Sequence, residues 1–200
     1  MNHAFPYSRF EAHLHGIYRR LIFKRRLKSL GEHSFISPFA ILEGMDCISV
    51  GGCSYIGRGT LIQATKSYNE DVFTPSVEIG DNVYIGQRCT ISTAVQMVIG
   101  DGVTIGDHVY IAGGRHAYED PTKGVRAQRL VTGSVKIGPD SWIGYGAFVA
   151  GTGELEIGEH SIVGANSMVN RSVPSFTAVA GSPARPIKRF DRTRSLWEVV

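Results

Sequence analysis

An all-β fold, a parallel β-helix of short repeated strands, is what the sequence predicts, and its glycines are the first indication. The chain has 200 residues, of which 24 are glycine, against roughly 7% in ordinary soluble proteins. The glycines follow aliphatic residues at steps of six, as in Ile79-Gly80 and Ile85-Gly86, which lead to Ile91. An apolar residue also stands two positions before each such group, and two is the period of a β-strand.

Five triplets of aliphatic residues keep the six-residue step. They begin at Val50, Ile79, Ile99, Ile137 and Ile157. Each triplet is interpreted as one coil of three short strands with its aliphatic side chains inside. Burying three aliphatic side chains gives about 5–9 kcal/mol, whereas ordering about 18 residues costs on the order of 20–30 kcal/mol. The coils must therefore stack to be stable. The period does not give the hand of the coil.

Two gaps interrupt the spacing of the triplets. The second triplet begins 29 residues after the first and the fourth begins 38 after the third, whereas the other intervals are 20 residues. The extra residues predict two loops, at about residues 65–76 and 113–134. Loops that leave a rigid scaffold often carry function, and a tolerated surface insertion is the alternative interpretation.

The chain divides into three predicted parts: an N-terminal helix at 1–30, the β-helix at 31–173, and an extended or helical tail at 174–200. The helix has an apolar face made of Phe10, Leu14, Ile17, Leu21 and Leu27. Its other face is basic and contains Arg19, Arg20, Lys24, Arg25, Arg26 and Lys28. Such a helix either caps the open end of the coil stack or lies on an anionic membrane surface. Nucleic acid is not an expected partner, because no aromatic platform or DNA-reading motif accompanies the charge.

Composition excludes several classes of protein. With 42% hydrophobic and 20% charged residues, the chain is not of the disordered class. Its apolar runs are far shorter than the roughly 18 residues that cross a bilayer, and its N-terminus lacks the pattern of a signal peptide. The three cysteines, Cys47, Cys53 and Cys89, form no CxxC pair. We therefore expect a cytoplasmic protein, with peripheral contact at the inner membrane face as a further option.

His116 is the candidate catalytic residue among the seven histidines. It lies in the longer predicted loop, close to Glu119 and Asp120, which could orient or polarise an imidazole. A zinc site needs three converging His or Cys ligands, and this loop holds no second histidine. We therefore expect no metal, and an enzyme like the γ-class carbonic anhydrases is disfavoured.

Three segments carry a resemblance to a known family. They are His116-Ala117-Tyr118-Glu119-Asp120-Pro121, IGPDSWIGYGAFV and IVGANSMVNRSVPSFTAVAGSPARPIK. Together with the repeat, over about residues 30–190, they resemble the left-handed β-helix hexapeptide-repeat acyltransferases, most closely the maltose, galactoside and polysaccharide O-acetyltransferases. The resemblance implies a left-handed coil, a homotrimer with each active site between neighbouring coils, and acetyl-CoA as cosubstrate.

The resemblance also implies roles for individual residues. His116 corresponds to the general base that takes a proton from the acceptor hydroxyl as it attacks the thioester of acetyl-CoA. Trp142 corresponds to a residue near the acetyl group, with Glu119 and Asp120 on the acceptor side. The CoA channel would be lined by Tyr145, Ala165, Asn170, Arg171, Arg185 and Lys188.

The loop departs from the family pattern just before His116. Many relatives carry an acidic residue and a second histidine there, whereas this chain has Gly113-Gly114-Arg115. The partner of the imidazole is therefore open among Glu119, Asp120 and a backbone carbonyl.

The activity that the resemblance implies is acetyl-CoA-dependent O-acetylation of a sugar hydroxyl, in the biosynthesis of a surface polysaccharide such as lipopolysaccharide or capsule. The acceptor would then be a sugar or a polysaccharide precursor. The alternative enzyme is an N-acetyltransferase of an amino sugar or a xenobiotic. A non-catalytic β-helix scaffold is the alternative from another class.

Overall fold

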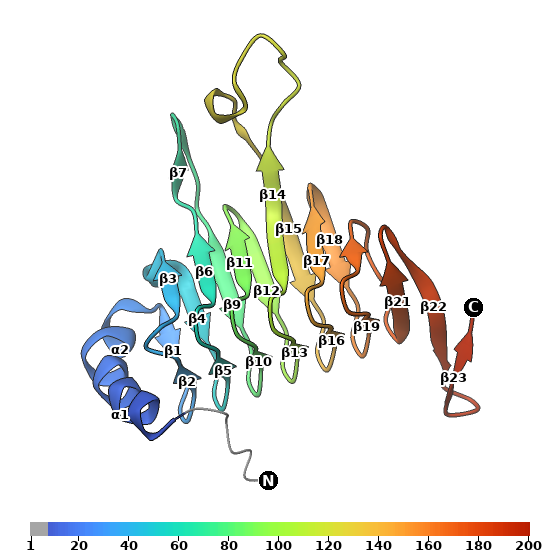
Figure 1. Ribbon diagram of the computed structural model, residues 1–200, viewed down its shortest axis with the longest axis horizontal. Coiled ribbons are helices and arrows are strands. Elements are labelled where there is room, and N and C mark those ends of the chain that lie inside the picture. Colours follow the sequence, from blue (N-terminus) through green and yellow to red (C-terminus); the bar gives the residue numbers. More distant parts are fainter. Residues whose placement is uncertain (1–7) are drawn as a thin grey trace.

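The computed structural model, which describes residues 8–200, winds the chain into a left-handed parallel β-helix with a helical segment at its N-terminal end (Figure 1). Each coil contributes one short strand to each of three faces, and the strands of successive coils pair in parallel. The predicted fold class is confirmed.

The three faces are named here after their first strands. The β1 face contains β1 (Ser29–Leu30), β4 (Ile48–Val50), β9 (Ser76–Ile79), β12 (Gln96–Ile99), β15 (Leu130–Ile137) and β18 (Gly153–Ile157). The β2 face contains β2 (Phe35–Ile36), β5 (Tyr55–Ile56), β10 (Tyr84–Ile85), β13 (Thr104–Ile105), β16 (Trp142–Ile143), β19 (Ile162–Val163), β21 (Thr177–Gly181), β22 (Ala184–Asp191) and β23 (Leu196–Val199). The β3 face contains β3 (Ile41–Glu43), β6 (Leu61–Ala64), β11 (Thr90–Thr93), β14 (Tyr110–His116), β17 (Phe148–Gly151) and β20 (Met168–Val169).

Aliphatic side chains of successive coils lie in register and form the core. Ile85 pairs with Ile56 on one side and with Ile105 on the other, and all three side chains are fully buried. Stacking therefore gives each aliphatic residue apolar neighbours from the coils above and below, which a single coil lacks.

The stack begins one coil earlier than the predicted first triplet. Its first coil consists of β1, β2 and β3, and Leu30, Ile36 and Leu42 keep the six-residue step there. The glycine spacing missed this coil because Ser37, and not glycine, follows its second aliphatic residue.

Close approach of successive coils explains the glycines at the corners. A Cβ on Gly57 would lie 2.5 Å from the carbonyl oxygen of Gly86 in the next coil. Two positions after such a corner residue the backbone is left-handed, with φ between 52° and 70° at His33, Cys53, Gly59, Asn82, Arg88, Gly102, His108, Asp140, Gly146, His160, Asn166 and Phe176.

Buried hydroxyl groups connect one coil to the next. The Ser54 hydroxyl donates to the carbonyl oxygen of Gly80 at 2.8 Å and accepts from the N–H of Val83 at 3.0 Å. Thr60 makes the same pair of bonds with Gly86 and Cys89. These small polar residues are therefore buried with their hydrogen-bonding groups satisfied.

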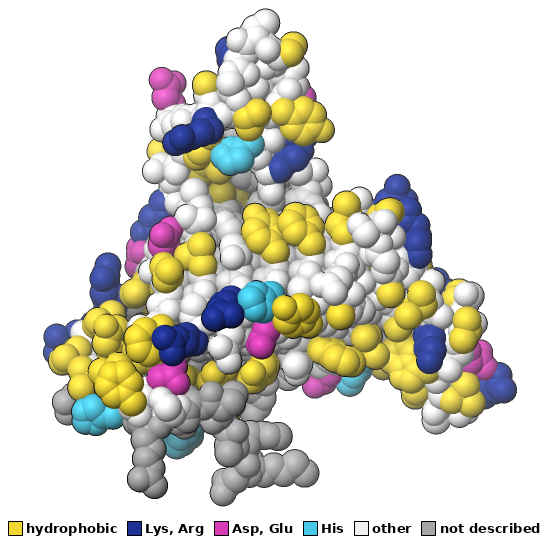
Figure 2. All heavy atoms as spheres, viewed as in Figure 1, with side chains coloured by type: hydrophobic (Ala, Val, Ile, Leu, Met, Phe, Trp, Pro, Cys, Tyr) yellow, Lys and Arg dark blue, Asp and Glu magenta, His cyan; other side chains and the backbone are white. Residues whose placement is uncertain are grey.

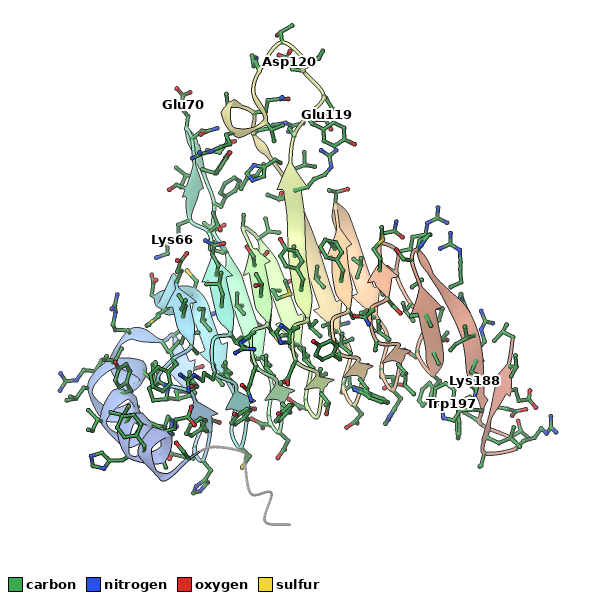
Figure 3. The ribbon with its side chains drawn as sticks, in the orientation of Figure 1. Lys66, Glu70, Glu119, Asp120, Lys188 and Trp197 are labelled. Atoms are coloured by element: carbon green, nitrogen blue, oxygen red, sulfur yellow. The ribbon has the colours of Figure 1, made fainter. Side chains whose placement is uncertain are left out.

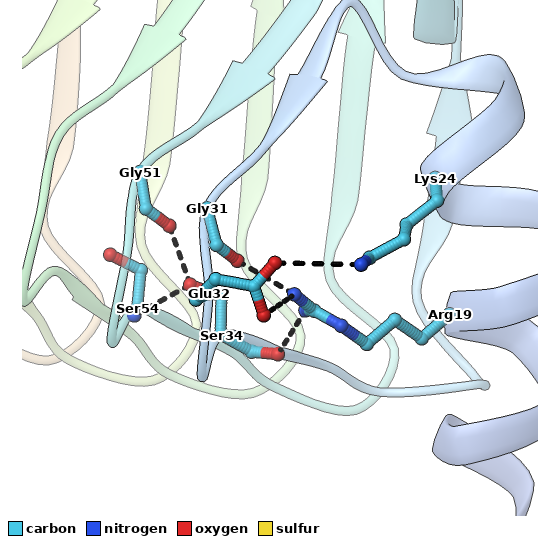
Figure 4. Close-up of polar contacts among 7 residues, drawn as sticks. All are labelled: Arg19, Lys24, Gly31, Glu32, Ser34, Gly51 and Ser54. Atoms are coloured by element: carbon cyan, nitrogen blue, oxygen red, sulfur yellow. Dashed lines mark hydrogen bonds and ion pairs between the residues drawn. The ribbon is translucent and has the colours of Figure 1, made fainter.

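The helical segment covers the open end of the first coil. It consists of α1 (Arg9–Tyr18), a π-helical turn (Arg19–Phe23) and α2 (Lys24–Arg26). Phe23 and Leu27 join the hydrophobic core. The Arg19 guanidinium donates to the carbonyl oxygens of Ser34 and Gly31, both at 2.9 Å (Figure 4). Apolar packing and charge-assisted hydrogen bonds therefore both attach this segment to the β-helix.

The predicted apolar face of this helix is wrong in part. Phe10 and Leu21 are 64% and 52% exposed, and Ile17 is exposed as well. In the π-helical turn the N–H of Lys24 bonds to the carbonyl of Arg19, five residues earlier, so the residues that follow are rotated relative to α1. Phe23 rather than Leu21 then faces the core. Hydrophobic and basic side chains share the outer surface over this segment (Figure 2).

Both predicted loops leave the β-helix at the same corner, between the β3 and β1 faces (Figure 1). The shorter forms a hairpin of β7 (Ser67–Tyr68) and β8 (Asp71–Val72). In the longer, β14 runs beyond the coil and pairs antiparallel with the start of β15. Residues 114–116 and 130–132 thus form a two-stranded ribbon, with residues 117–129 at its tip.

The chain beyond residue 173 is extended. β21 lies parallel to β19, and β22 and β23 follow as antiparallel strands. The segment predicted as an extended or helical tail thus continues the β2 face as strands, and residues 174–200 contain no helix.

Candidate active site

His116 is the last residue of β14, and its backbone pairs with Leu130 across the ribbon. Its side chain is exposed, and its ring lies against that of Tyr68 in the hairpin, with 5.1 Å between the ring centroids and a tilt of 56°. Within residues 8–200, no group forms a hydrogen bond with the imidazole. A ring nitrogen is therefore available to accept a proton from a ligand, as a general base must.

Glu119, a predicted partner of His116, is bound to other groups. Its carboxylate accepts hydrogen bonds from the Arg115 guanidinium at 2.6 Å and from the N–H of Tyr118 at 2.9 Å. These contacts, that of Arg115 above all, lower the pKa of Glu119 to about 2. The Arg115 guanidinium also donates to the backbone carbonyl of His116 at 2.9 Å. The carboxylate of Glu119 therefore neutralises Arg115 and does not orient the imidazole.

Asp120 is likewise bound elsewhere. Its carboxylate accepts from the Thr122 hydroxyl at 2.6 Å and pairs with Lys123 at 3.1 Å. The hydrogen bond from Thr122 and the contact with Lys123 lower the pKa of Asp120 to about 2. Figure 3 shows Glu119 and Asp120 on the outer part of the ribbon. Both predicted acidic residues are therefore close to His116 in the sequence, but neither forms a hydrogen bond with its ring.

A cavity of about 420 Å³ opens between the two excursions and the β3 face. Residues from the hairpin, the face and the ribbon line it, including Thr65, Tyr68, Ser92, Tyr110, His116 and Thr132. Among the described residues that line it, only Arg115 carries a formal charge at neutral pH, and that charge is paired with Glu119. The cavity is therefore lined by neutral polar, aromatic and small apolar groups, with His116 among them.

A chain of hydrogen bonds runs along the floor of this cavity. The Gln63 amide nitrogen donates to the Glu43 carboxylate at 2.7 Å, and the Ser92 hydroxyl donates to the Gln63 amide oxygen at 3.1 Å. With its proton committed to Gln63, the oxygen of Ser92 is left as an acceptor. A ligand that donates hydrogen bonds, such as a hydroxyl compound, suits this floor.

The predicted acetyl-site tryptophan lies on another part of the molecule. Trp142 is in β16 on the β2 face, where it is 54% exposed, and Tyr145 follows at the next corner, also 54% exposed. Ala165 lies at the equivalent corner of the next coil, because the N–H of Asn166 bonds to the carbonyl of Tyr145 at 2.8 Å. In Figure 1, β16 lies at the edge opposite the ribbon, so one chain does not bring Trp142 to His116.

Three predicted CoA-binding residues meet at a second cavity. Asn170, Arg171 and Arg185 line a cavity of about 190 Å³ where the last coil passes into β22. Lys188, another of the six predicted CoA-binding residues, is further along β22, paired with the backbone of Ala178 and outside that lining. Figure 3 shows it on the C-terminal strands, away from Glu119 and Asp120.

Other kinds of site are not formed by the described residues. Within residues 8–200, no group of three or more His, Cys, Asp or Glu side chains converges around a metal position. Over the same range, none of the helices has the length and apolar character needed to cross a membrane. Cys89 is buried, and burial raises the pKa of its thiol to about 11, which disfavours a thiolate nucleophile.

Known proteins share the repeat of this chain. Residues 76–114 match the family described as the hexapeptide repeat of succinyl-transferase. The chain is 30% identical over 142 residues to a Mycobacterium tuberculosis protein named as an acetyltransferase, covering 70% of this chain and 44% of that protein. It is 32% identical over 130 residues to Escherichia coli WbbJ, named as a lipopolysaccharide biosynthesis O-acetyl transferase, covering 63% of this chain and 64% of WbbJ. The chain thus spans less than two thirds of either relative.

The same fold occurs in AntD, an N-acyltransferase from Bacillus cereus whose mutant crystal structure contains dTDP and coenzyme A. The TM-score is 0.71 at 22% identity, over 94% of this chain and 92% of AntD. The predicted resemblance to the hexapeptide-repeat acyltransferases is confirmed, and the chain carries their repeat and their β-helix.

Sequence reasoning did not single out Tyr68, Ser92 or the other cavity residues outside the longer loop. A usable signal was present, because the two loops follow Ile62 and Ile111, each the third aliphatic residue of its triplet. Third positions of successive triplets stack on one face. The two loops could therefore have been placed at the same corner, with a shared space between them.

Proposed function

We propose that this hexapeptide-repeat chain transfers an acetyl group from acetyl-CoA to a hydroxyl group of a sugar, with His116 as the general base. The observation that carries the proposal is the imidazole, free of hydrogen bonds from residues 8–200, at the 420 Å³ cavity. A ring nitrogen takes the proton of the acceptor hydroxyl while the oxygen attacks the thioester carbon. The C–S bond then breaks, and the departing CoA thiolate takes that proton from the imidazolium, so that CoA leaves as a thiol, the imidazole is neutral again, and the acceptor keeps the acetyl group as an ester. A backbone N–H near the thioester stabilises the oxyanion.

The lining of the cavity supports a sugar as acceptor. Hydroxyl groups donate to the oxygen of Ser92, and the aromatic side chains of the half-buried Tyr68 and the exposed Tyr110 suit the apolar face of a sugar ring. The name of the relative WbbJ refers to lipopolysaccharide biosynthesis. We therefore propose a precursor of a surface polysaccharide as the acceptor.

The second cavity supports a place for the cosubstrate. Arg171 and Arg185 line it together with Asn170, and two guanidinium groups at one cavity suit the phosphates of acetyl-CoA. Lys188 would add a cation beside them. Trp142, Tyr145 and Ala165 would line the path from this cavity toward the acetyl group.

A homotrimer would complete the site. His116 lies at the corner between the β3 and β1 faces, whereas Trp142 lies on the β2 face, so two copies are needed to bring these residues together. The β3 face also carries a row of residues in register across its strands that is apolar except at Thr90, formed by Ile41, Leu61, Thr90, Tyr110, Phe148 and Met168. A row of this kind supports contact with a neighbouring subunit.

The helical segment would bring the enzyme to a membrane-bound acceptor. Phe10 and Leu21 are exposed on the same helical segment as the exposed basic residues Lys24, Arg25 and Arg26. Apolar groups that enter a bilayer surface and cations that attract anionic lipids act together in peripheral binding. We propose a cytoplasmic enzyme that contacts the inner membrane face.

Transfer to an amine is the second candidate. AntD, which shares the fold, is named as an N-acyltransferase, and the same free imidazole could deprotonate an ammonium group. Assays with an amino sugar beside its hydroxyl counterpart distinguish the two acceptors. A non-catalytic scaffold predicts that neither compound accepts an acetyl group.

Replacement of His116 tests the general base. We expect His116→Ala to lower the release of CoA thiol from acetyl-CoA by about 10²- to 10⁴-fold with the fold intact. The matched control is His13→Ala, since His13 is exposed on α1 far from the cavity. A wild-type rate for His116→Ala would exclude the proposed base.

Replacement of Arg171 and Arg185 tests the place of the cosubstrate. The double variant Arg171→Ala/Arg185→Ala loses two charge-assisted contacts, so we expect KM for acetyl-CoA to rise about 10- to 100-fold, with KM for the acceptor nearly unchanged. Arg189→Ala, on the same strand β22, is the control. If only KM for the acceptor moved, CoA would have to bind elsewhere.

A further inference from the structure

Three hydrogen bonds attach the β7–β8 hairpin to the ribbon. The Tyr68 hydroxyl donates to the carbonyl oxygen of Arg126 at 2.8 Å. The Asn69 amide donates to the same oxygen at 3.2 Å and to the carbonyl of Gln128 at 3.3 Å. Asn69 stands at the turn of the hairpin with φ of 52°, a conformation that asparagine adopts more readily than most residues. These bonds, called here the hairpin contact, join segments that the sequence holds far apart.

The segment that accepts the hairpin contact is itself fixed within the ribbon tip. The Gln128 side chain, only 8% exposed, accepts from the N–H of Asp120 and donates to the carbonyls of Asp120 and Lys123, at 3.0 to 3.2 Å. Next to His116, the N–H of Ala117 donates to the carbonyl of Arg129 at 2.9 Å. The hairpin is therefore hydrogen-bonded to the ribbon tip. The backbone of the tip is in turn hydrogen-bonded to Ala117, the residue that follows His116.

Tyr68 connects the hairpin contact to the imidazole. One end of its side chain, the hydroxyl, is held by Arg126, while its ring lies 5.1 Å from the ring of His116. Within residues 8–200, no second ring and no hydrogen bond restrains the imidazole. The orientation of the His116 ring therefore depends on the ring of Tyr68.

We infer that Tyr68 is a positioning residue for His116: the hairpin contact fixes the phenol ring, and the phenol ring holds the imidazole toward the cavity. The inference rests on the proposed function and adds a residue from a different excursion to its site. A general base acts only when its nitrogen is within reach of the acceptor proton, and a small displacement of a reacting group lowers the rate strongly. In this chain an aromatic contact takes the place of the acidic partner that Glu119 and Asp120 do not supply.

Three variants separate the two parts of this arrangement. Tyr68→Leu removes the ring, Tyr68→Phe keeps the ring and removes one hydrogen bond, and Asn69→Ala removes the other hydrogen bonds without changing a residue of the cavity lining. Tyr118→Leu is the matched control, because Tyr118 is an exposed aromatic residue of the ribbon that packs on Arg115.

The kinetic constants carry the first test. We expect Tyr68→Leu to lower kcat about tenfold or more, with KM for acetyl-CoA unchanged. Tyr68→Phe and Asn69→Ala should lower kcat by smaller factors, and Tyr118→Leu should leave it at the wild-type value. A role for Tyr68 in acceptor binding alone would instead raise KM for the acceptor in the Tyr68 variants and leave Asn69→Ala unaffected, which would overturn the inference.

The accessibility of His116 carries the second test, which does not depend on activity. We expect diethyl pyrocarbonate to modify His116 several-fold faster in Tyr68→Leu than in the wild type, measured by mass spectrometry of the peptide that contains it. The rate at His13 should be the same in both proteins and shows that the fold is intact. Equal rates at His116 would contradict the inference.

The two proposals fail in different ways. If the wild type shows no acetyl transfer, or if His116→Ala keeps full activity, the proposed function fails. If His116→Ala is inactive while all three hairpin variants keep the wild-type kcat and modification rate, only the role of Tyr68 fails.

Discussion

The glycine that follows an inward aliphatic residue has no room for a side chain. At Gly57 an added Cβ would meet the backbone of Gly86 at 2.5 Å, and Gly86 in turn faces Asp107 and Gly106. The sequence predicted small residues at these corners from the spacing alone. The left-handed residue two places later is Gly, Asn, Asp or His in most coils, and these types adopt that conformation readily. At Cys53, Arg88 and Phe176 local preference does not favour it, and the coil imposes the conformation.

A pair of glycine substitutions tests the corner at the residue scale. We expect Gly57→Ala to lower the free energy of unfolding by about 1–3 kcal/mol or more, because the new methyl group meets backbone atoms that cannot move aside. Gly16→Ala should raise it by about 0.5–1 kcal/mol, because Gly16 lies in α1 with nothing near its Cβ position. Chemical denaturation measures both, and equal effects would contradict close approach as the reason for glycine at the corners.

The sequence did not determine which group contacts the imidazole of His116. Glu119 and Asp120 were candidates because they are near in the chain, but neighbours in the chain also include Arg115 and Lys123, which bind these carboxylates. The residue that does contact the imidazole, Tyr68, is 48 positions away and arrives through a separate excursion. Local sequence could not rank these contacts, since they depend on where the two excursions meet.

At the scale of elements, the strands were predictable and the helix was predictable only in part. Strand positions follow from a six-residue step that the stacking enforces in every coil. The N-terminal helix was expected as well, but its buried face assumed a regular period of 3.6 residues. The π-helical turn at Arg19–Phe23 breaks that period, so Phe23 is buried and Leu21 lies on the outer surface. Phe10, which precedes the turn in α1, is exposed as well.

This outer surface predicts membrane contact that can be measured. Wild-type protein should sediment with vesicles of phosphatidylcholine and phosphatidylglycerol, less so as the salt concentration rises, because screening weakens the attraction of Lys24, Arg25 and Arg26 to anionic lipid. Phe10→Ser/Leu21→Ser should reduce the bound fraction several-fold. Val199→Ser, which changes an apolar residue that is 81% exposed at the other end of the chain, is the control. Binding of the double variant at the wild-type level would leave coverage of the first coil as the role of this helix.

At the scale of the whole molecule, the candidate site is in two parts. The ribbon and hairpin place His116 at one corner of the β-helix, while Trp142 and the cavity of Arg171 and Arg185 belong to other parts of the surface. The roles of these residues were predicted from the family resemblance. The positions of the two excursions were predicted from the spacing of the repeat. The separation of the two parts became visible only when the strands were assigned to faces, because one six-residue step carries the chain from one face to the next.

Mixing two inactive variants tests the central claim, that one copy supplies His116 and its neighbour supplies the CoA cavity. His116→Ala and Arg171→Ala/Arg185→Ala are unfolded and refolded separately and together, then assayed at an acetyl-CoA concentration below the raised KM of the second variant. In random trimers, about one site in four combines an intact His116 with an intact CoA cavity from its neighbour. The account predicts that the mixture recovers roughly a quarter of wild-type activity. A refolded mixture no more active than the average of the separate variants would contradict it.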